Sequence, residues 1–212
     1  MNNFIGFGLA FTGLFLYDRM QLNREIFFAC RTTNLSPGRP QRFSTYGVRS
    51  VNSNKKIMAI EALAGKVAEF KKAGKTVVHC HGCFDLVHPG HIKYFQAAKA
   101  MGDVLIVTVT PDIYVDKGPG RPVFNQELRA ESIAALECVD YVAVNKWVTA
   151  EETLRLVRPD IYAKGQEFER LEDKTGKVQR EAEVVKEIGA QLRFTHEIVF
   201  SSTQLLKQHV RK

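Results

Sequence analysis

The chain has 212 residues, of which 45% are hydrophobic and 25% are charged, so it is long enough and apolar enough to build one folded core. Its formal charge of +7 is concentrated at one end, because residues 1–60 carry a net charge of +6 and leave +1 for residues 61–212. Proteins that bind nucleic acid spread basic side chains over the folded surface, so this distribution argues against a nucleic-acid partner.

The first 57 residues differ from the rest of the chain. Phe4 to Tyr17 is an apolar run broken only by Gly and Thr, but a bilayer-spanning helix needs about 20 apolar residues and a secretory signal begins with positive charge. Residues 30–56 are rich in Arg, Ser, Thr, Asn and Pro and contain no acidic residue, which predicts disorder. We expect residues 1–57 to be disordered or to precede a true start at Met58, with targeting or anchoring as the alternative. Residues 58–212 are then the folded domain, cytoplasmic and without firm membrane association.

The first half of that domain alternates helix and strand. Apolar residues at helical spacing predict a helix over 57–72, closed by Gly74. Val77 and Val78 indicate a short buried strand, and a helix is expected over 90–101. Val104 to Val109 is an unbroken apolar run, typical of a strand covered on both faces.

The second half continues the alternation. Helices are expected over 126–136, over 149–157 with Thr149 as N-cap, over 178–188 with Gly189 as cap, and over 202–210. Strands are expected over 141–144, 161–163 and 192–194. This order predicts an α/β fold: a Rossmann-like parallel sheet with helices on both faces. Ligands bind such sheets at the carboxyl ends of the strands, where the strand order reverses.

The loop after the first strand carries the strongest chemical signal. It runs from Gly82 to His91 and places His88 and His91 at a helix start, with Gly90 between them. A helix N-terminus attracts phosphate through its free N–H groups and its dipole. Gly90 lets a phosphate approach the backbone, and the two imidazoles can stabilise charge that develops during phosphoryl chemistry. This combination predicts a phosphate site.

The same residues resemble the H-x-G-H signature of the cytidylyltransferase-like nucleotidyltransferases. The form Gly-Cys-Phe-Asp followed by His-x-Gly-His is similar to the adenylyltransferase domain of bacterial ADP-heptose synthesis, with glycerol-3-phosphate cytidylyltransferases second. The resemblance extends from about Thr76 to Leu206. It includes Arg121-Pro122, Lys164-Gly165 and Ser201-Ser202-Thr203, the last of which resembles the family's closing Ser-Thr-Thr motif.

The resemblance implies an enzyme that transfers a nucleoside monophosphate from ATP or CTP to a small phosphorylated substrate, such as heptose 1-phosphate, and releases pyrophosphate. It assigns catalytic roles to His88, His91, Lys117 and Arg129. It assigns nucleotide binding to Gly82, Cys83, Phe84, Asp85, Gly90, Lys164, Gly165, Ser201, Ser202 and Thr203. Mg²⁺ is expected to arrive with the triphosphate rather than in a protein metal site.

Two positions depart from the family pattern. Val199 stands where relatives usually carry Gly, and His196 stands where cytidylyltransferases carry Arg. Both leave the choice between ATP and CTP open. A homodimer is expected because relatives are often dimers. A separate sugar kinase is implied, because some relatives carry a fused sugar kinase domain and this sequence shows none. A nucleotide-binding module without catalysis is the alternative from another functional class.

Several residues also have simpler interpretations. Cys80 and Cys83 match the C-x-x-C redox spacing, although Cys80 falls in a strand rather than at a helix start. The same cysteines with His88 and His91 form a candidate zinc set. Lys164-Gly165 could be only a strand-end turn, and Ser201-Ser202-Thr203 only a helix cap.

Overall fold

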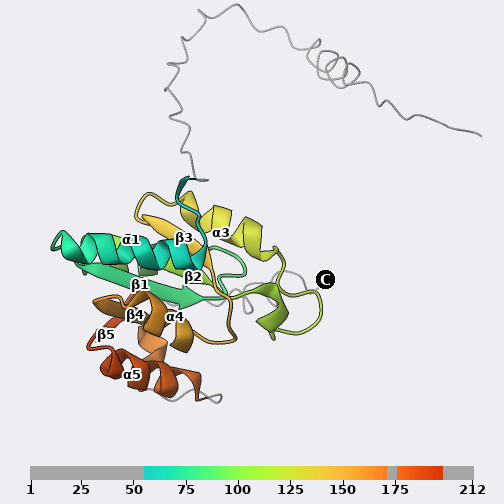
Figure 1. The fold of residues 1–212 in the computed structure, drawn as a ribbon. Coiled ribbons are helices and arrows are strands. Elements are labelled where there is room, and N and C mark those ends of the chain that lie inside the picture. Colours follow the sequence, from blue (N-terminus) through green and yellow to red (C-terminus); the bar gives the residue numbers. More distant parts are fainter. Residues whose placement is uncertain (1–54, 171–175, 198–212) are drawn as a thin grey trace, which may run out of the picture. The chain divides into compact units, whose positions relative to one another are not determined.

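A five-stranded parallel sheet forms the centre of the structure, a computed structural model that describes residues 55–170 and 176–197. The strand order is β3-β2-β1-β4-β5, and each neighbouring pair is parallel. The strands are β1 (Val77–Gly82), β2 (Val104–Val109), β3 (Tyr141–Val144), β4 (Ile161–Gly165) and β5 (Gln191–Thr195). The predicted Rossmann-like sheet is therefore confirmed (Figure 1).

Helices cover both faces of this sheet. They are α1 (Ile60–Lys72), α2 (Pro89–Lys99), α3 (Gln126–Ala134), α4 (Glu151–Val157) and α5 (Lys177–Glu187), with short 3-10 helices η2 (Asp112–Tyr114) and η3 (Gln166–Phe168). On one face, α2 and α3 pack on the sheet through a core that contains Phe95, Leu105 and Ile133. On the other face, α1 packs through Leu63 against Ile106, and α4 and α5 pack through further buried residues around Tyr162.

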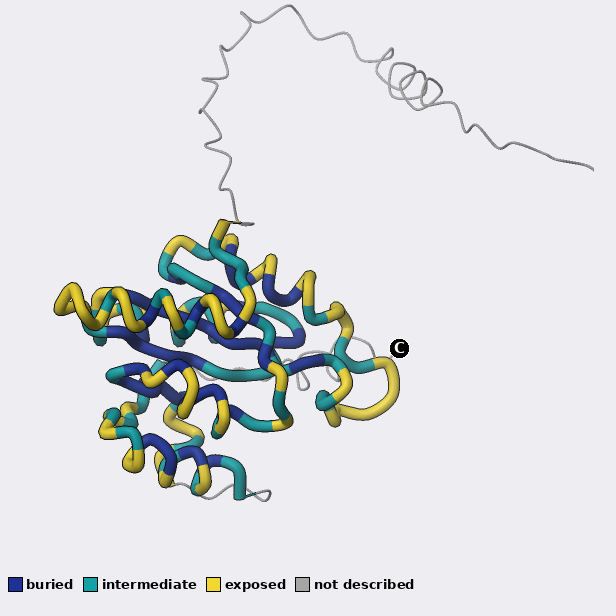
Figure 2. Tube along the Cα trace, in the orientation of Figure 1, coloured by how far each residue is buried: buried dark blue, intermediate teal, exposed yellow. Residues whose placement is uncertain are grey.

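Burial is continuous along the central strands of the sheet, and only the edge strand β5 alternates between more and less buried residues. All six residues of β2 are buried, because helices lie over both faces, as its unbroken apolar run predicts (Figure 2). In α5, Val178, Glu181, Val184 and Val185 form the buried stripe. Glu181 is thus a carboxylate within an apolar stripe, and such a group requires a partner.

Several predicted boundaries shift by one to three residues, and the end of β1 shifts by four. The first helix begins at Ile60 because Ile57 instead forms a parallel bridge with Val142, and Met58 N–H donates to the Val142 carbonyl at 3.0 Å. β1 and β4 are longer than predicted, so Lys164 and Gly165 belong to β4 and are not a turn. Gly74 and Gly189 adopt positive φ angles of 73° and 74°, which confirms both predicted helix caps.

The expectation that Thr149 caps α4 is wrong. Ala150 occupies the N-cap position and makes no side-chain capping bond. Thr149 Oγ1 instead donates to Glu151 Oε1 at 3.1 Å, and the Thr149 carbonyl accepts from Asn145 Nδ2 at 2.8 Å. The predicted helix over 202–210 lies outside the described residues.

The described fold begins just upstream of the predicted boundary at residue 58. Lys56 Nζ donates to the carbonyls of Leu136 and Val139 at 3.0 and 2.7 Å, beyond the end of α3. Lys56 therefore stabilises the folded domain. Of the helices in the described ranges, none is long and apolar enough to cross a membrane.

Strand connectivity places the ligand site. The chain runs from β1 outward through β2 to β3 and then returns to add β4 on the opposite side of β1. The order therefore reverses between β1 and β4, and the carboxyl ends of these strands form the expected crevice.

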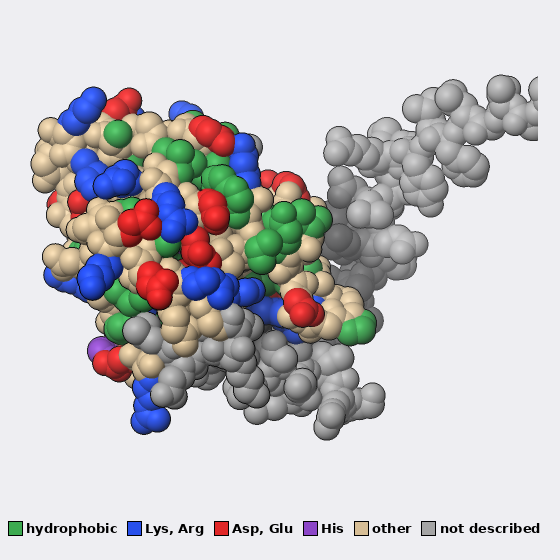
Figure 3. Space-filling model, turned by 60° about the horizontal axis from the view of Figure 1, so that its bottom comes forward, with side chains coloured by type: hydrophobic (Ala, Val, Ile, Leu, Met, Phe, Trp, Pro, Cys, Tyr) green, Lys and Arg blue, Asp and Glu red, His purple; other side chains and the backbone are tan. Residues whose placement is uncertain are grey.

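On the face shown in Figure 3, basic and acidic side chains are interspersed rather than segregated by sign.

Candidate active site

A cavity of about 660 Å³ opens at the carboxyl ends of the strands. Residues at or just after the ends of four strands line it: His81 and Gly82, Thr110, Lys164 and Gly165, and Thr195. The start of α2 adds His88, Gly90 and His91, and the segment after η2 adds Lys117. The volume is within the range of small-molecule sites. The sequence-predicted phosphate loop and the crevice therefore coincide.

The first half of the phosphate loop is held in a tight turn. Phe84 has a φ of 47°, in the left-handed region, and its ring packs against Phe95 with centroids 5.0 Å apart. A Cβ atom at Gly82 would lie 2.9 Å from Phe84 Cζ, so only glycine fits at Gly82 without a shift of the ring. Gly82 and Phe84 thus shape the turn that leads from β1 to α2.

His88 and His91 form one stacked unit at the start of α2. Their ring centroids are 3.8 Å apart with an interplanar angle of 18°. His88 is the N-cap residue, and its Nδ1 accepts from the His91 backbone N–H at 3.3 Å. An accepting Nδ1 is unprotonated, so the neutral His88 ring carries its proton on Nε2.

Burial keeps both rings neutral. The pKa of His91 is lowered to about 4, mainly by desolvation, with smaller contributions from the nearby His88 and Lys117. Desolvation also lowers the pKa of His88, partly opposed by a backbone hydrogen bond. Neutral imidazoles can stack closely without charge repulsion. A bound triphosphate would favour protonation of both rings, because negative charge stabilises imidazolium.

Asp85 connects the phosphate loop to the segment that contains Lys117. Its buried carboxylate accepts from Arg121 Nε and from the Val123 backbone N–H, the latter at 2.6 Å. These contacts agree with the expectation that Asp85 orders the loop. Lys117 lines the cavity.

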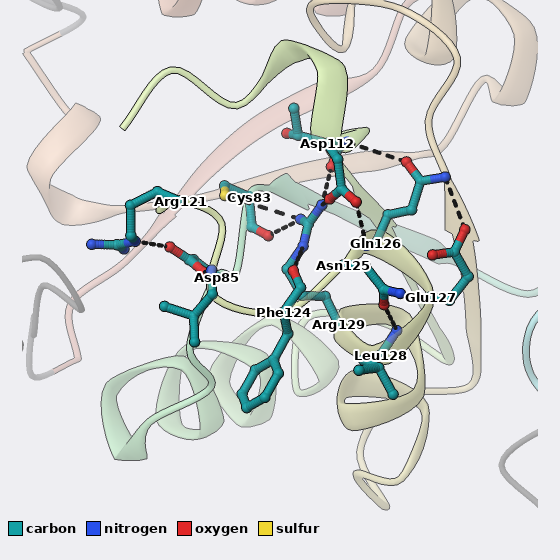
Figure 4. Close-up of polar contacts among 12 residues, drawn as sticks. Cys83, Asp85, Asp112, Arg121, Phe124, Asn125, Gln126, Glu127, Leu128 and Arg129 are labelled. Carbon is teal, nitrogen blue, oxygen red and sulfur yellow. Dashed lines mark hydrogen bonds and ion pairs between the residues drawn. The ribbon is translucent and has the colours of Figure 1, made fainter. Parts of the chain in front are cut away.

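Arg129 requires a correction. The sequence suggested that it faces the phosphates, but its side chain is fully buried and does not line the cavity. Its guanidinium donates to the carbonyls of Cys83, Thr110 and Phe124 and to Asp112 Oδ1, the last at 2.6 Å (Figure 4). Protein acceptors therefore engage all three guanidinium nitrogens. Arg129 thus joins three loops around the cavity.

Lys164 and Gly165 line the cavity from the end of β4. Lys164 is almost fully buried, and its Nζ lies 2.7 Å from Glu181 Oε2, which also accepts from the Tyr162 hydroxyl at 3.0 Å. The sequence did not identify Glu181 or Tyr162 as site residues. The available signal was the carboxylate of Glu181 on the apolar side of a predicted helix.

The alternative uses of the cysteines find no support. Burial raises the pKa of the Cys80 thiol to about 12 and raises that of Cys83, the opposite of what a reactive redox pair requires. Cys83 directs its carbonyl to Arg129 and lines the cavity. In the part of the chain that the structure describes, no group of three His, Cys, Asp or Glu side chains could hold a metal ion. Ser201, Ser202 and Thr203 lie outside the described residues.

Fold and site together define an α/β nucleotidyltransferase, with a histidine pair at a helix N-terminus facing a cavity at the switch point of a parallel sheet. The model of the cytidylyltransferase-like family matches residues 79–208, and the chain belongs to this family.

Curated relatives and one solved structure are similar to this chain. The bifunctional protein HldE of Sulfurimonas denitrificans is 44% identical over 119 residues, which cover 55% of this chain and 25% of HldE. HldE of Pseudomonas entomophila is 32% identical over 166 residues, which cover 77% of this chain and 34% of HldE. The chain thus matches only a quarter to a third of these relatives. A lipopolysaccharide core biosynthesis protein of Thermoplasma volcanium is 26% identical and covers 60% of this chain and all of its own, with a TM-score of 0.47.

Proposed function

We propose that this chain transfers a nucleoside monophosphate from ATP or CTP to a small phosphorylated substrate and releases pyrophosphate. The observation that carries the proposal is the stacked pair His88 and His91 at the start of α2, which faces the cavity together with Lys117. An acceptor phosphate oxygen attacks the α-phosphorus, the new P–O bond forms, and the bond to the β-phosphate oxygen breaks. Such a reaction needs positioning and charge neutralisation rather than a covalent enzyme intermediate.

The residues of the loop have distinct roles in this proposal. The N–H groups at the start of α2 hold phosphate oxygens, and Gly90 permits close approach. His88 and His91 donate to the α- and β-phosphates and stabilise the charge that develops as pyrophosphate leaves. Lys117 neutralises phosphate charge from the opposite loop. Ser201, Ser202 and Thr203 are proposed to hold the terminal phosphates.

Mg²⁺ is proposed to enter with the triphosphate. The described residues offer no carboxylate cage, and Asp85 is already committed to Arg121 and Val123. Mg²⁺ commonly binds through substrate phosphates and few protein ligands. Its contribution would be to neutralise charge on the phosphates.

A sugar 1-phosphate such as heptose 1-phosphate is the proposed acceptor. The support is the similarity to HldE proteins together with the Gly-Cys-Phe-Asp form of the first motif. A sugar kinase would supply this acceptor. Cysteines 80, 83 and 138 are free thiols, which suits the reducing cytoplasm. A homodimer is likewise part of the proposal, on family resemblance alone.

The test is pyrophosphate release by purified protein with Mg²⁺, ATP or CTP, and a panel of sugar 1-phosphates and polyol phosphates. Release with one nucleotide, abolished in His88→Ala/His91→Ala, is the expected result and also identifies the donor. Turnover of CTP with glycerol 3-phosphate would instead indicate the cytidylyltransferase reaction. Triphosphate binding without release for any acceptor would favour a binding module.

A further inference from the structure

The cavity has two chemically different ends. The end at α2 carries the histidine pair and Lys117, which suit phosphate. The far end lies between η3, α5 and β5 and is lined by three acidic residues, Glu167, Glu181 and Glu197, and by two basic ones, Lys164 and Lys177. A group with net negative charge, such as an acceptor phosphate, is disfavoured there. The far end suits a neutral group that donates hydrogen bonds.

Glu181 is the carboxylate that the fold positions most firmly at this end. It is 4% exposed, whereas Glu167 is exposed and solvated. The Lys164 ammonium lies 2.7 Å from Glu181 Oε2 and is itself held 5.0 and 5.2 Å from the ring centroids of Tyr162 and Phe168. The carboxylate therefore cannot swing away without breaking an ion pair that is nearly fully buried.

One oxygen of this carboxylate remains to bind a ligand. Lys164 Nζ and the Tyr162 hydroxyl both engage Oε2, and within the described ranges no bond is made to Oε1. Glu181 lines the cavity beside the apolar side chains of Phe168 and Val178. Oε1 is thus a hydrogen-bond acceptor of fixed position, next to an aromatic and an aliphatic side chain. These surroundings suit a flat heterocycle that carries an amino group.

We propose that Glu181 is a specificity-determining residue, whose Oε1 accepts a hydrogen bond from the exocyclic amino group of the donor nucleotide's base. The inference rests on the proposed nucleotidyl transfer. It explains how one site accepts adenine or cytosine, which carry an amino group, and rejects hypoxanthine or uracil, which present a carbonyl oxygen at the same position. A carbonyl opposite a carboxylate gains no hydrogen bond and is repelled, which corresponds to a loss of about tenfold to a hundredfold in affinity.

The experiment measures Kd for two matched nucleotide pairs, ATP with ITP and CTP with UTP, by calorimetry on the full chain with Mg²⁺. If the protein uses adenine nucleotides, its Kd for ATP should be at least tenfold lower than for ITP. If it uses cytosine nucleotides, the same should hold for CTP against UTP. Glu181→Gln keeps the shape and can still accept from Lys164, but its amide turns a donor toward the base. We expect the preference to fall to near one or to reverse. Glu183→Gln, on the exposed side of the same helix, is the matched control and should keep the preference.

Thermal unfolding of each variant shows whether weaker binding results only from a loss of folding. Tyr162→Phe is a second control variant. This variant removes the hydroxyl from Oε2 but leaves the carboxylate and Lys164 in place, so it should retain the amino preference. A folded Glu181→Gln protein that still prefers ATP over ITP by tenfold overturns the proposal. The proposal is also overturned if Glu181→Gln leaves the ratio of the two nucleotide Kd values unchanged but raises KM for the sugar phosphate. That result would place the acceptor substrate, rather than the base, at Glu181. Either result leaves pyrophosphate release intact, whereas failure of the proposed function abolishes release itself.

Discussion

His88 and His91 stack with ring centroids 3.8 Å apart, and the same His88 ring accepts the backbone N–H of His91 at 3.3 Å. One side chain therefore both caps α2 and belongs to the proposed catalytic pair. These two roles can be separated by substitution, because asparagine also caps helices but has no imidazole.

His88→Asn and His88→Ala test the two roles. Loss of the imidazole should lower kcat by about 10²–10³ in both variants, since one donor to developing charge is removed. His88→Ala should also lose about 1 kcal/mol of stability through the missing cap, whereas His88→Asn should not. Steady-state pyrophosphate release and urea unfolding measure the two effects. Full activity in His88→Asn would mean that His88 acts only as a cap.

Arg129 should be essential for the arrangement of the loops rather than for direct phosphate contact. Arg129→Lys cannot supply the donors that reach Cys83, Thr110, Phe124 and Asp112, so buried carbonyls lose their partners. The expected cost is about 2 kcal/mol or more of stability, with reduced kcat/KM. Arg155→Lys, in an exposed pair with Glu187, is the control and should change stability by less than about 0.5 kcal/mol. A stable Arg129→Lys protein with impaired nucleotide binding alone would restore the direct role.

Particular residues show how much of the fold and of the site could be predicted from the sequence. The run Val104 to Val109 identified β2 without error, because a strand buried on both faces must be apolar throughout. Ile57 fits a helical stripe and a bridge to Val142 equally well, so the start of α1 was displaced. The burial and contacts of Arg129 and Glu181 could not be predicted, because they depend on tertiary partners. A charged residue in a sequence does not reveal whether its side chain faces solvent, backbone carbonyls or an opposite charge.

Asp85 should control the position of Lys117. Asp85→Ala removes the acceptor of Arg121 Nε and of the Val123 N–H, so the segment that contains Lys117 loses its attachment to the phosphate loop. We expect KM for the nucleotide to rise about tenfold or more, as for the loss of a charge-assisted hydrogen bond. Asp85→Asn keeps an acceptor for Val123 and should show a smaller change. Equal kinetics for both variants and the wild type would remove Asp85 from this role.

Lys56 should stabilise the folded domain although it precedes the predicted boundary. Its Nζ engages the Leu136 and Val139 carbonyls, and Lys56→Met leaves both acceptors without that donor. The expected loss is about 1–3 kcal/mol, measured by urea unfolding of the full chain. Lys55→Met is the matched control, because Lys55 is exposed. A chain that starts at Met58 should be less stable than one that starts at Lys55, and equal stability would show that Lys56 contributes nothing.

Folding should weaken as pH falls below neutrality. Burial lowers the pKa of His81 to about 3 and that of His91 to about 4, and it lowers the pKa of His79 well below its usual value. A histidine whose pKa is depressed in the folded state binds fewer protons there than in the unfolded chain, so its contribution is complete above about pH 6.5 and is lost as pH falls. Between pH 6.5 and 5, His81 and His91 together should cost up to about 4 kcal/mol, at 1.36 kcal/mol for each unit and group. Urea unfolding across this range measures the slope. His81→Asn should reduce it by about half of that amount, and an unchanged slope would show that His81 is not the group that titrates.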